Sequence, residues 1–142
     1  MCRTTQRVKG MTPEQKFWEL MRDHIPGHAN RIENTVANGI PDINYCYHGK
    51  ETWLELKAKP IIRKLDMVGN VIEATSCIRT TQYIWHRTRT LAGGKVLVLG
   101  RDEDKIVGLL ATTGLALYRV MLIQEKPWNW EKIEELLKGE YE

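Results

Sequence analysis

The sequence predicts an α/β fold in which helices cover both faces of a mixed central sheet. Residues 13–24 carry apolar side chains at helical spacing, and residues 43–57 alternate apolar and polar side chains around a tight turn. Residues 95–100 form an almost continuous apolar run, which is typical of a central strand covered on both faces. In chain order the predicted elements are helix, strand, hairpin, helix, strand, edge strand and helix.

The length of 142 residues fits one domain with a single core. Within this domain, 1–142, we expect a flexible arm over 1–10, a core over about 12–100, and a C-terminal edge strand and helix over 101–142. Lys and Arg total 21 against 18 for Asp and Glu. That small excess favours a polyanionic partner only where the basic residues cluster.

The cysteines and the hydropathy pattern indicate the compartment. Cys2, Cys46 and Cys77 are odd in number, widely spaced, and match no paired zinc-ligand pattern. No segment approaches the roughly 20 apolar residues of a membrane span, and the N-terminus lacks the apolar run of a signal peptide. We therefore expect a soluble cytoplasmic protein with reduced thiols and no membrane partner.

The first helix has a clear start signal and an unusual acid. Thr12 fits an N-cap, Pro13 the first helical position, and Gln15 a capping box. Glu14 falls within the apolar stripe of this helix, whereas Glu19 falls on the polar side. Glu14 either interacts with the helix dipole or serves a functional site.

A strand is expected over 31–34, where Arg31 and Glu33 share one face. They form either a cross-strand salt pair or part of a site. The chain then enters a hairpin that turns at 48–50.

The second strand of the hairpin carries two charged side chains on one face. Glu55 and Lys57 share a face, Leu54 and Leu56 share the other, and Asp42 begins the preceding strand. Converging carboxylates repel each other unless a cation sits between them, and Mg²⁺ or Mn²⁺ prefers such oxygen ligands. Alternatively, Asp42 ends a Pro-Asp turn and the other two charges form a solvated strand pair.

The wider pattern resembles a known family. Pro41-Asp42, twelve residues and then Glu55-Leu56-Lys57 resemble the motif of the PD-(D/E)XK nuclease superfamily. Together with Arg-Ile-Glu-Asn at 31–34 and Thr-x-Gln-x-x-Trp at 80–85, they are similar to the small phage-encoded VRR-NUC nucleases, relatives of Holliday-junction resolvases. The likeness covers about 12–100.

This resemblance implies a restriction-endonuclease-like core and a site. Asp42, Glu55 and the backbone carbonyl of Leu56 would bind Mg²⁺ or Mn²⁺, and Lys57 would be the catalytic cation. Gln82 would pack near the metal; without the resemblance it reads as a polar residue in a first helical turn. The additional acid of the first helix would be Glu14, with Glu19 and Glu33 as competitors.

The function implied is metal-dependent DNA endonuclease activity, phage-encoded and acting in the host cytoplasm. A homodimer that prefers Holliday junctions or other branched DNA is expected, with water as the nucleophile. Basic residues expected to contact DNA are Arg31, Lys59, Arg63, Lys64, Arg87 and Arg89. Residues 60–76 and the end after Gly100 match nothing in the family. A DNA-binding or packaging accessory protein that does not cut, or an RNA nuclease, are the alternatives.

Overall fold

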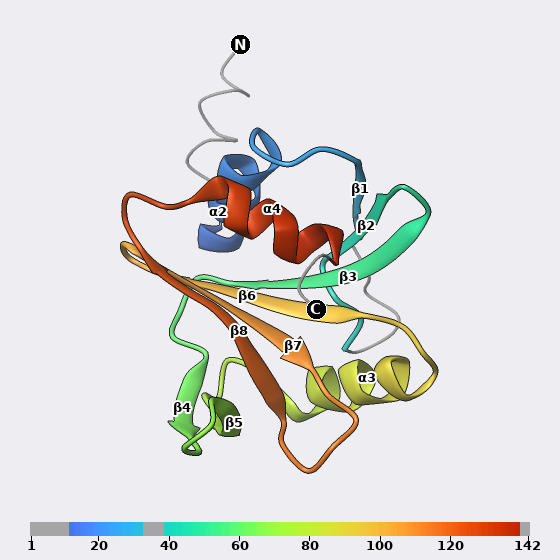
Figure 1. Ribbon diagram of the computed structural model, residues 1–142, viewed down its shortest axis with the longest axis vertical. Helices are drawn as coiled ribbons and strands as arrows, with labels where there is room; N and C mark the ends of the chain where they lie inside the picture. The colour runs from blue at the N-terminus through green and yellow to red at the C-terminus, as the bar shows by residue number, and fades with distance from the viewer. Residues whose placement is uncertain (1–11, 33–38, 140–142) are drawn as a thin grey trace.

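The computed structural model describes residues 12–32 and 39–139, in which three helices flank an eight-stranded sheet (Figure 1). The helices are α2 (Pro13–Arg22), α3 (Thr80–Leu91) and α4 (Trp130–Lys138). The strands are β1 (His28–Arg31), β2 (Ile43–Tyr47), β3 (Lys50–Lys57), β4 (Ile62–Leu65), β5 (Asn70–Ala74), β6 (Val96–Asp102), β7 (Lys105–Ala111) and β8 (Tyr118–Glu125).

The sheet is mixed, with the order β1-β2-β3-β6-β7-β8-β5-β4. β3 and β6 are parallel and in register from Trp53 with Val96 to Lys57 with Gly100, and the other neighbours are antiparallel. Helix α3 makes the crossover between the two parallel strands, as parallel pairing requires. This connection brings the start of α3 toward the end of β3.

Two apolar clusters lie on opposite faces of the sheet. Helices α2 and α4 cover one face, on which β6 presents Leu97 and Leu99. Helix α3 lies on the other face in Figure 1, on which β6 presents Val96 and Val98. All four β6 side chains are at most 1% exposed, so the apolar run correctly predicted a strand covered on both sides.

The predicted helices and hairpin are confirmed. Thr12 caps α2, accepting from the Gln15 N–H at 3.1 Å while the Gln15 side chain accepts from the Thr12 N–H at 2.8 Å. The second helix occupies 80–91, and the last helix buries Ile133, Leu136 and Leu137. The hairpin pairs Ile43 with Leu54 and closes next to Lys50.

Two strand predictions are wrong. The first strand is β1 at His28–Arg31, not 31–34, and Glu33 and Asn34 lie outside the described residues. Strand β7, predicted as an edge strand, lies between β6 and β8 because the unassigned stretch at 118–125 forms a further antiparallel strand. The actual edges are β1 and β4.

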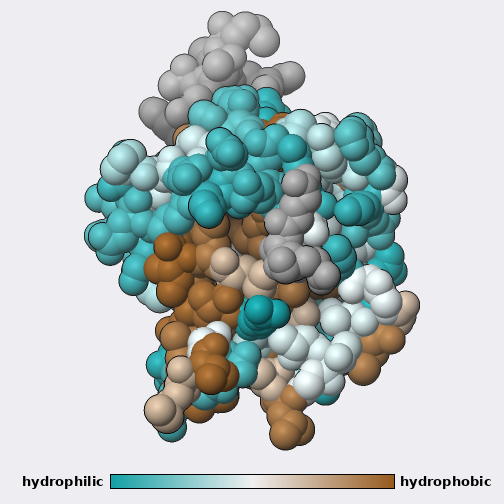
Figure 2. Space-filling model, viewed as in Figure 1, coloured by the Kyte–Doolittle hydropathy of each residue, from teal (hydrophilic) through white to brown (hydrophobic). Residues whose placement is uncertain are grey.

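The surface is divided by polarity. In Figure 2 the part around α2 and α4 is largely hydrophilic, whereas apolar side chains gather below it, over β8 and down to the β4–β5 hairpin of Figure 1. At the tip of the β4–β5 hairpin, Met67 and Val68 are 101% and 80% exposed. No helix within 12–32 and 39–139 is long and apolar enough to cross a membrane.

Candidate active site

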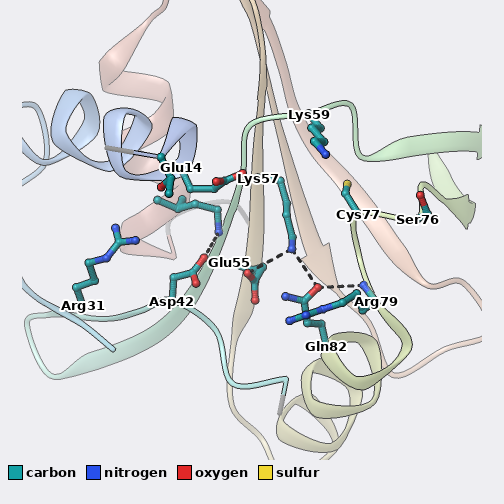
Figure 3. A pocket seen from close by; sticks show the side chains of 12 residues that line it. Glu14, Arg31, Asp42, Glu55, Lys57, Lys59, Ser76, Cys77, Arg79 and Gln82 are labelled. Carbon is teal, nitrogen blue, oxygen red and sulfur yellow. Dashed lines mark hydrogen bonds and ion pairs between the residues drawn. The ribbon is translucent and has the colours of Figure 1, made fainter. Parts of the chain in front are cut away.

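A pocket of about 440 Å³ lies where the end of β3 meets the starts of α2 and α3 (Figure 3). Its acidic residues are Glu14, Asp42 and Glu55. Its basic residues are Arg31, Lys57, Lys59 and Arg79. Thr12, Leu56, Ser76, Cys77 and Gln82 complete the lining. The pocket therefore combines a group of carboxylates with a larger group of cations.

Asp42 is held in place by backbone contacts on two sides. Its own carbonyl accepts from the Ile32 N–H at 2.6 Å, and its Oδ2 accepts from the Leu56 N–H at 3.1 Å. Upstream, Gly39 is buried with φ +88°, and a Cβ there would clash with the Thr81 carbonyl. Only glycine readily gives this left-handed conformation and this close approach, which fixes the loop before Asp42 against α3.

Asp42 and Glu55 converge, as the hairpin pattern predicted. Asp42 directly precedes Ile43 and Glu55 directly follows Leu54, and because Ile43 and Leu54 pair in the antiparallel register, the two acids face each other at the end of that ladder. Burial, followed by repulsion from Glu55 and a hydrogen bond to it, raises the pKa of Asp42 to about 7. Burial also raises the pKa of Glu55, which is 2% exposed, although the nearby Lys57 ammonium limits the rise.

Lys57 lies beside Glu55 and is oriented by α3. Its Nζ is 3.8 Å from Glu55 Oε2 and donates to Gln82 Oε1 at 3.1 Å. The same Gln82 oxygen accepts from the Arg79 N–H at 3.0 Å at the start of α3. Gln82 is 5% exposed, so this buried amide fixes the ammonium relative to the helix.

Glu14 points toward the pocket, and Glu19 does not. Glu14 Oε2 accepts from the Ala58 N–H at 3.2 Å, which ties α2 to the end of β3. Glu19 is exposed and pairs with Arg22 at 3.2 Å. The apolar stripe of the first helix therefore predicted the orientation of both acids. Glu33, the third candidate, lies outside the described residues.

The basic residues expected to contact DNA fall into two groups. Arg31 and Lys59 line the pocket, whereas the other four do not. Arg63 pairs with Glu73 at 3.5 Å on the β4–β5 hairpin, next to the exposed Lys64.

The α3 arginines have partners within the protein. The guanidinium of Arg87 donates to the carbonyls of Thr113 at 3.0 Å and Gly114 at 2.6 Å. Arg89 pairs with Glu51 at 2.9 Å and lies over the rings of Trp53 and Trp85. Both arginines therefore lie outside the pocket with partners inside the protein, and their contact with DNA stays a prediction.

Sequence reasoning missed several residues at the site. Arg79 and Cys77 line the pocket just before α3, and His86 lies behind Glu55, 3.7 Å from Oε1 to Nε2. Burial and the charge of Lys57 lower the pKa of His86 to about 4, so the imidazole is neutral at pH 7. His86 follows Gln82 by four residues and so shares its helix face, a signal that the sequence did contain.

The donor set fits a divalent cation with oxygen ligands. Among residues 12–32 and 39–139, no group of three or more His, Cys, Asp and Glu gathers as metal ligands. The candidate ligands are the carboxylates of Asp42 and Glu55, which line the same pocket and whose pKa values are both raised by burial. Mg²⁺ keeps several waters and commonly takes one or two protein carboxylates, so Asp42 and Glu55 are enough protein ligands for it.

The acidic pair predicts a pH-dependent stability difference. Folding raises the pKa of Asp42 from 3.8 to about 7, so between these values the folded chain holds more protons at this site than the unfolded chain. Asp42 therefore lowers the free energy of unfolding as pH rises, by up to about 1.4 kcal/mol per pH unit. The lowered pKa of His86 acts in the opposite direction between pH 4 and 6.5.

Comparison with Asp42→Asn isolates the Asp42 contribution, because His86 is present in both proteins. In EDTA, urea unfolding should show Asp42→Asn gaining stability over wild type from pH 4 to 7 and keeping a constant advantage above about pH 8. A stability difference that does not change with pH would contradict the raised pKa.

No protein-family model matches this sequence, and a search of curated proteins finds no match.

Proposed function

We propose that this chain is a metal-dependent endonuclease that hydrolyses phosphodiester bonds in DNA. The observation that carries the proposal is the convergence of Asp42, Glu55 and Lys57 in one pocket whose rim is basic. Carboxylates alone would repel a phosphodiester. A Mg²⁺ or Mn²⁺ ion held by Asp42 and Glu55 would reverse that repulsion, polarise a phosphoryl oxygen and favour attack by water.

The other charged residues of the pocket have roles that suit phosphodiester hydrolysis. Lys57 places an ammonium beside Glu55, where it can stabilise negative charge that develops on the phosphate. Arg31, Lys59 and Arg79 can hold the flanking backbone phosphates. Glu14 has a second carboxylate oxygen with which to orient water. No nucleophilic side chain is required, so the proposed reaction is direct hydrolysis.

The substrate is proposed to be branched DNA, bound by a symmetric homodimer. Resolving a four-way junction requires two matched nicks, and a twofold pair of subunits supplies one site for each. Contacts made mainly by Lys and Arg to phosphate depend weakly on sequence and strongly on salt. This part of the proposal rests on the resemblance to junction resolvases.

A substrate panel tests the proposed function. Labelled duplex, flap, single-stranded and four-way DNA, together with an RNA duplex, would be incubated with Mg²⁺, Mn²⁺ or EDTA, and light scattering would give the mass. We expect metal-dependent cleavage, fastest on the four-way junction, by a dimer. Binding without cleavage would indicate an accessory protein, and preferential cleavage of RNA would indicate an RNA nuclease. A monomer that cuts duplex as readily as junctions would contradict the junction assignment.

The inward acid gives a separate prediction. Glu14→Gln keeps an oxygen that can accept from the Ala58 N–H but removes the charge at the pocket. A hydrogen bond to a charged group contributes about 1.5 kcal/mol, so the cleavage rate should fall on the order of tenfold. Glu19→Gln is the matched control, because Glu19 lies on the exposed face of the same helix. Equal rates in the two variants would remove Glu14 from the reaction.

A further inference from the structure

A buried polar chain runs behind the acidic pair, from β8 through α3 to β3. The hydroxyl of Tyr118 is 2.7 Å from His86 Nδ1, and His86 Nε2 is 3.7 Å from Glu55 Oε1. Tyr118 and His86 are 0% exposed, and Glu55 is 2% exposed. Three polar side chains from distant parts of the sequence thus meet out of contact with solvent.

This arrangement has an energetic cost that the fold alone does not require. The Tyr118 ring packs in an apolar cluster with Val98 and Leu109, where a phenylalanine would fit without a hydroxyl to satisfy. Glu55 Oε1 and His86 Nε2 face each other, yet neither has a hydrogen-bond partner within the described residues. Buried polar groups are usually fully paired, and unpaired ones often mark functional sites.

The tautomer of the His86 imidazole decides which of these polar groups donate and which accept. A neutral imidazole has one N–H donor and one acceptor nitrogen. With the proton on Nε2, the N–H is directed at Glu55 Oε1, 3.7 Å away, while Nδ1 accepts from the Tyr118 hydroxyl. With the proton on Nδ1, a nitrogen lone pair would face the carboxylate. The Glu55 carboxylate can only accept and so favours the proton on Nε2, and the Tyr118 hydroxyl supports that tautomer by donating to Nδ1.

We propose that Tyr118 and His86 act as a positioning pair that orients the Glu55 carboxylate for the divalent cation. The Nε2–H of His86 is directed at Oε1 from 3.7 Å, which leaves Oε2 on the side where Lys57 Nζ lies 3.8 Å away. The inference rests on the proposed function, since it assigns these residues to the same metal site. Neither residue touches the cation or the substrate; they act through Glu55.

Metal affinity is the first test. Tyr118→Phe removes one oxygen atom and keeps the ring, so it should weaken Mn²⁺ binding to the DNA-free protein about tenfold, as loss of such supporting contacts typically does. Tyr83→Phe is the matched control, because the Tyr83 ring packs edge-on against Tyr118 with centroids 6.1 Å apart. Calorimetric titration of both variants and wild type, beside their melting temperatures, separates metal affinity from stability.

The tautomer of His86 is the second test and needs no variant. Nitrogen-15 NMR of wild type at pH 7.5 should show the proton on Nε2, and Tyr118→Phe should reduce this preference. A proton on Nδ1 in wild type, or wild-type Mn²⁺ affinity in Tyr118→Phe, overturns the positioning role alone. Absence of any Mn²⁺ binding by wild type overturns the proposed function and this inference with it.

Discussion

Asp42→Asn is expected to abolish cleavage and at the same time to stabilise the metal-free protein at pH 8. The amide removes a cation ligand, and with it several kcal/mol of transition-state stabilisation, on the order of a thousandfold or more in rate. It also removes a charge whose burial is unfavourable, because the carboxyl has a pKa of about 7 beside Glu55. An oxygen still remains to accept from the Leu56 N–H.

Opposite effects on rate and stability distinguish a functional residue from a structural one. Cleavage rates and urea midpoints of Asp42→Asn would be measured beside Asp102→Asn, which changes an exposed aspartate at the end of β6. Glu55→Gln should lose cleavage as Asp42→Asn does. Wild-type rates in either site variant would show that the acidic pair does not take part in the reaction.

Lys57→Met is expected to lower the cleavage rate about a hundredfold to a thousandfold while leaving metal binding in place. Methionine keeps most of the side-chain length but removes the ammonium that lies 3.8 Å from Glu55 Oε2 and 3.1 Å from Gln82 Oε1. Removal of one preorganised donor at a developing negative charge has an effect of this size. Single-turnover rates under saturating Mn²⁺ would measure it.

Two further variants give this prediction its controls. Lys57→Arg should not restore the rate, because a planar guanidinium cannot occupy the ammonium position against Gln82. Lys105→Met, at an exposed position on β7, should cut as wild type does. If Lys57→Met loses Mn²⁺ binding as well as cleavage, Lys57 supports the cation site and does not stabilise the transition state.

The centre of the site could be predicted because it depends on local periodicity. Alternation along β3 sends Leu54 and Leu56 into the core, which leaves Glu55 and Lys57 on the opposite face. A two-stranded hairpin then places Asp42 opposite Glu55 without any long-range information. The first helix gave the orientation of Glu14 for the same reason, since its apolar stripe has a clear period.

The rest depends on long-range packing, which a single sequence does not display. Tyr118 meets His86 only because β8 joins the sheet beyond β7, and 118–125 lacks a clean alternation that would have marked it as a strand. The β4–β5 hairpin falls within 60–76, a stretch to which the resemblance assigns nothing. Arg87 was assigned to DNA by its charge, and only the fold reveals that its guanidinium donates to the carbonyls of 112–114.

Mn²⁺ titration of wild type and Asp42→Asn by calorimetry, at pH 8 and without DNA, tests the central claim that Asp42 and Glu55 hold a divalent cation. We expect saturable binding to wild type and loss of that binding in Asp42→Asn, together with a folded variant that is more stable than wild type in EDTA. Equal Mn²⁺ affinity in the two proteins, or no binding to wild type, would contradict it.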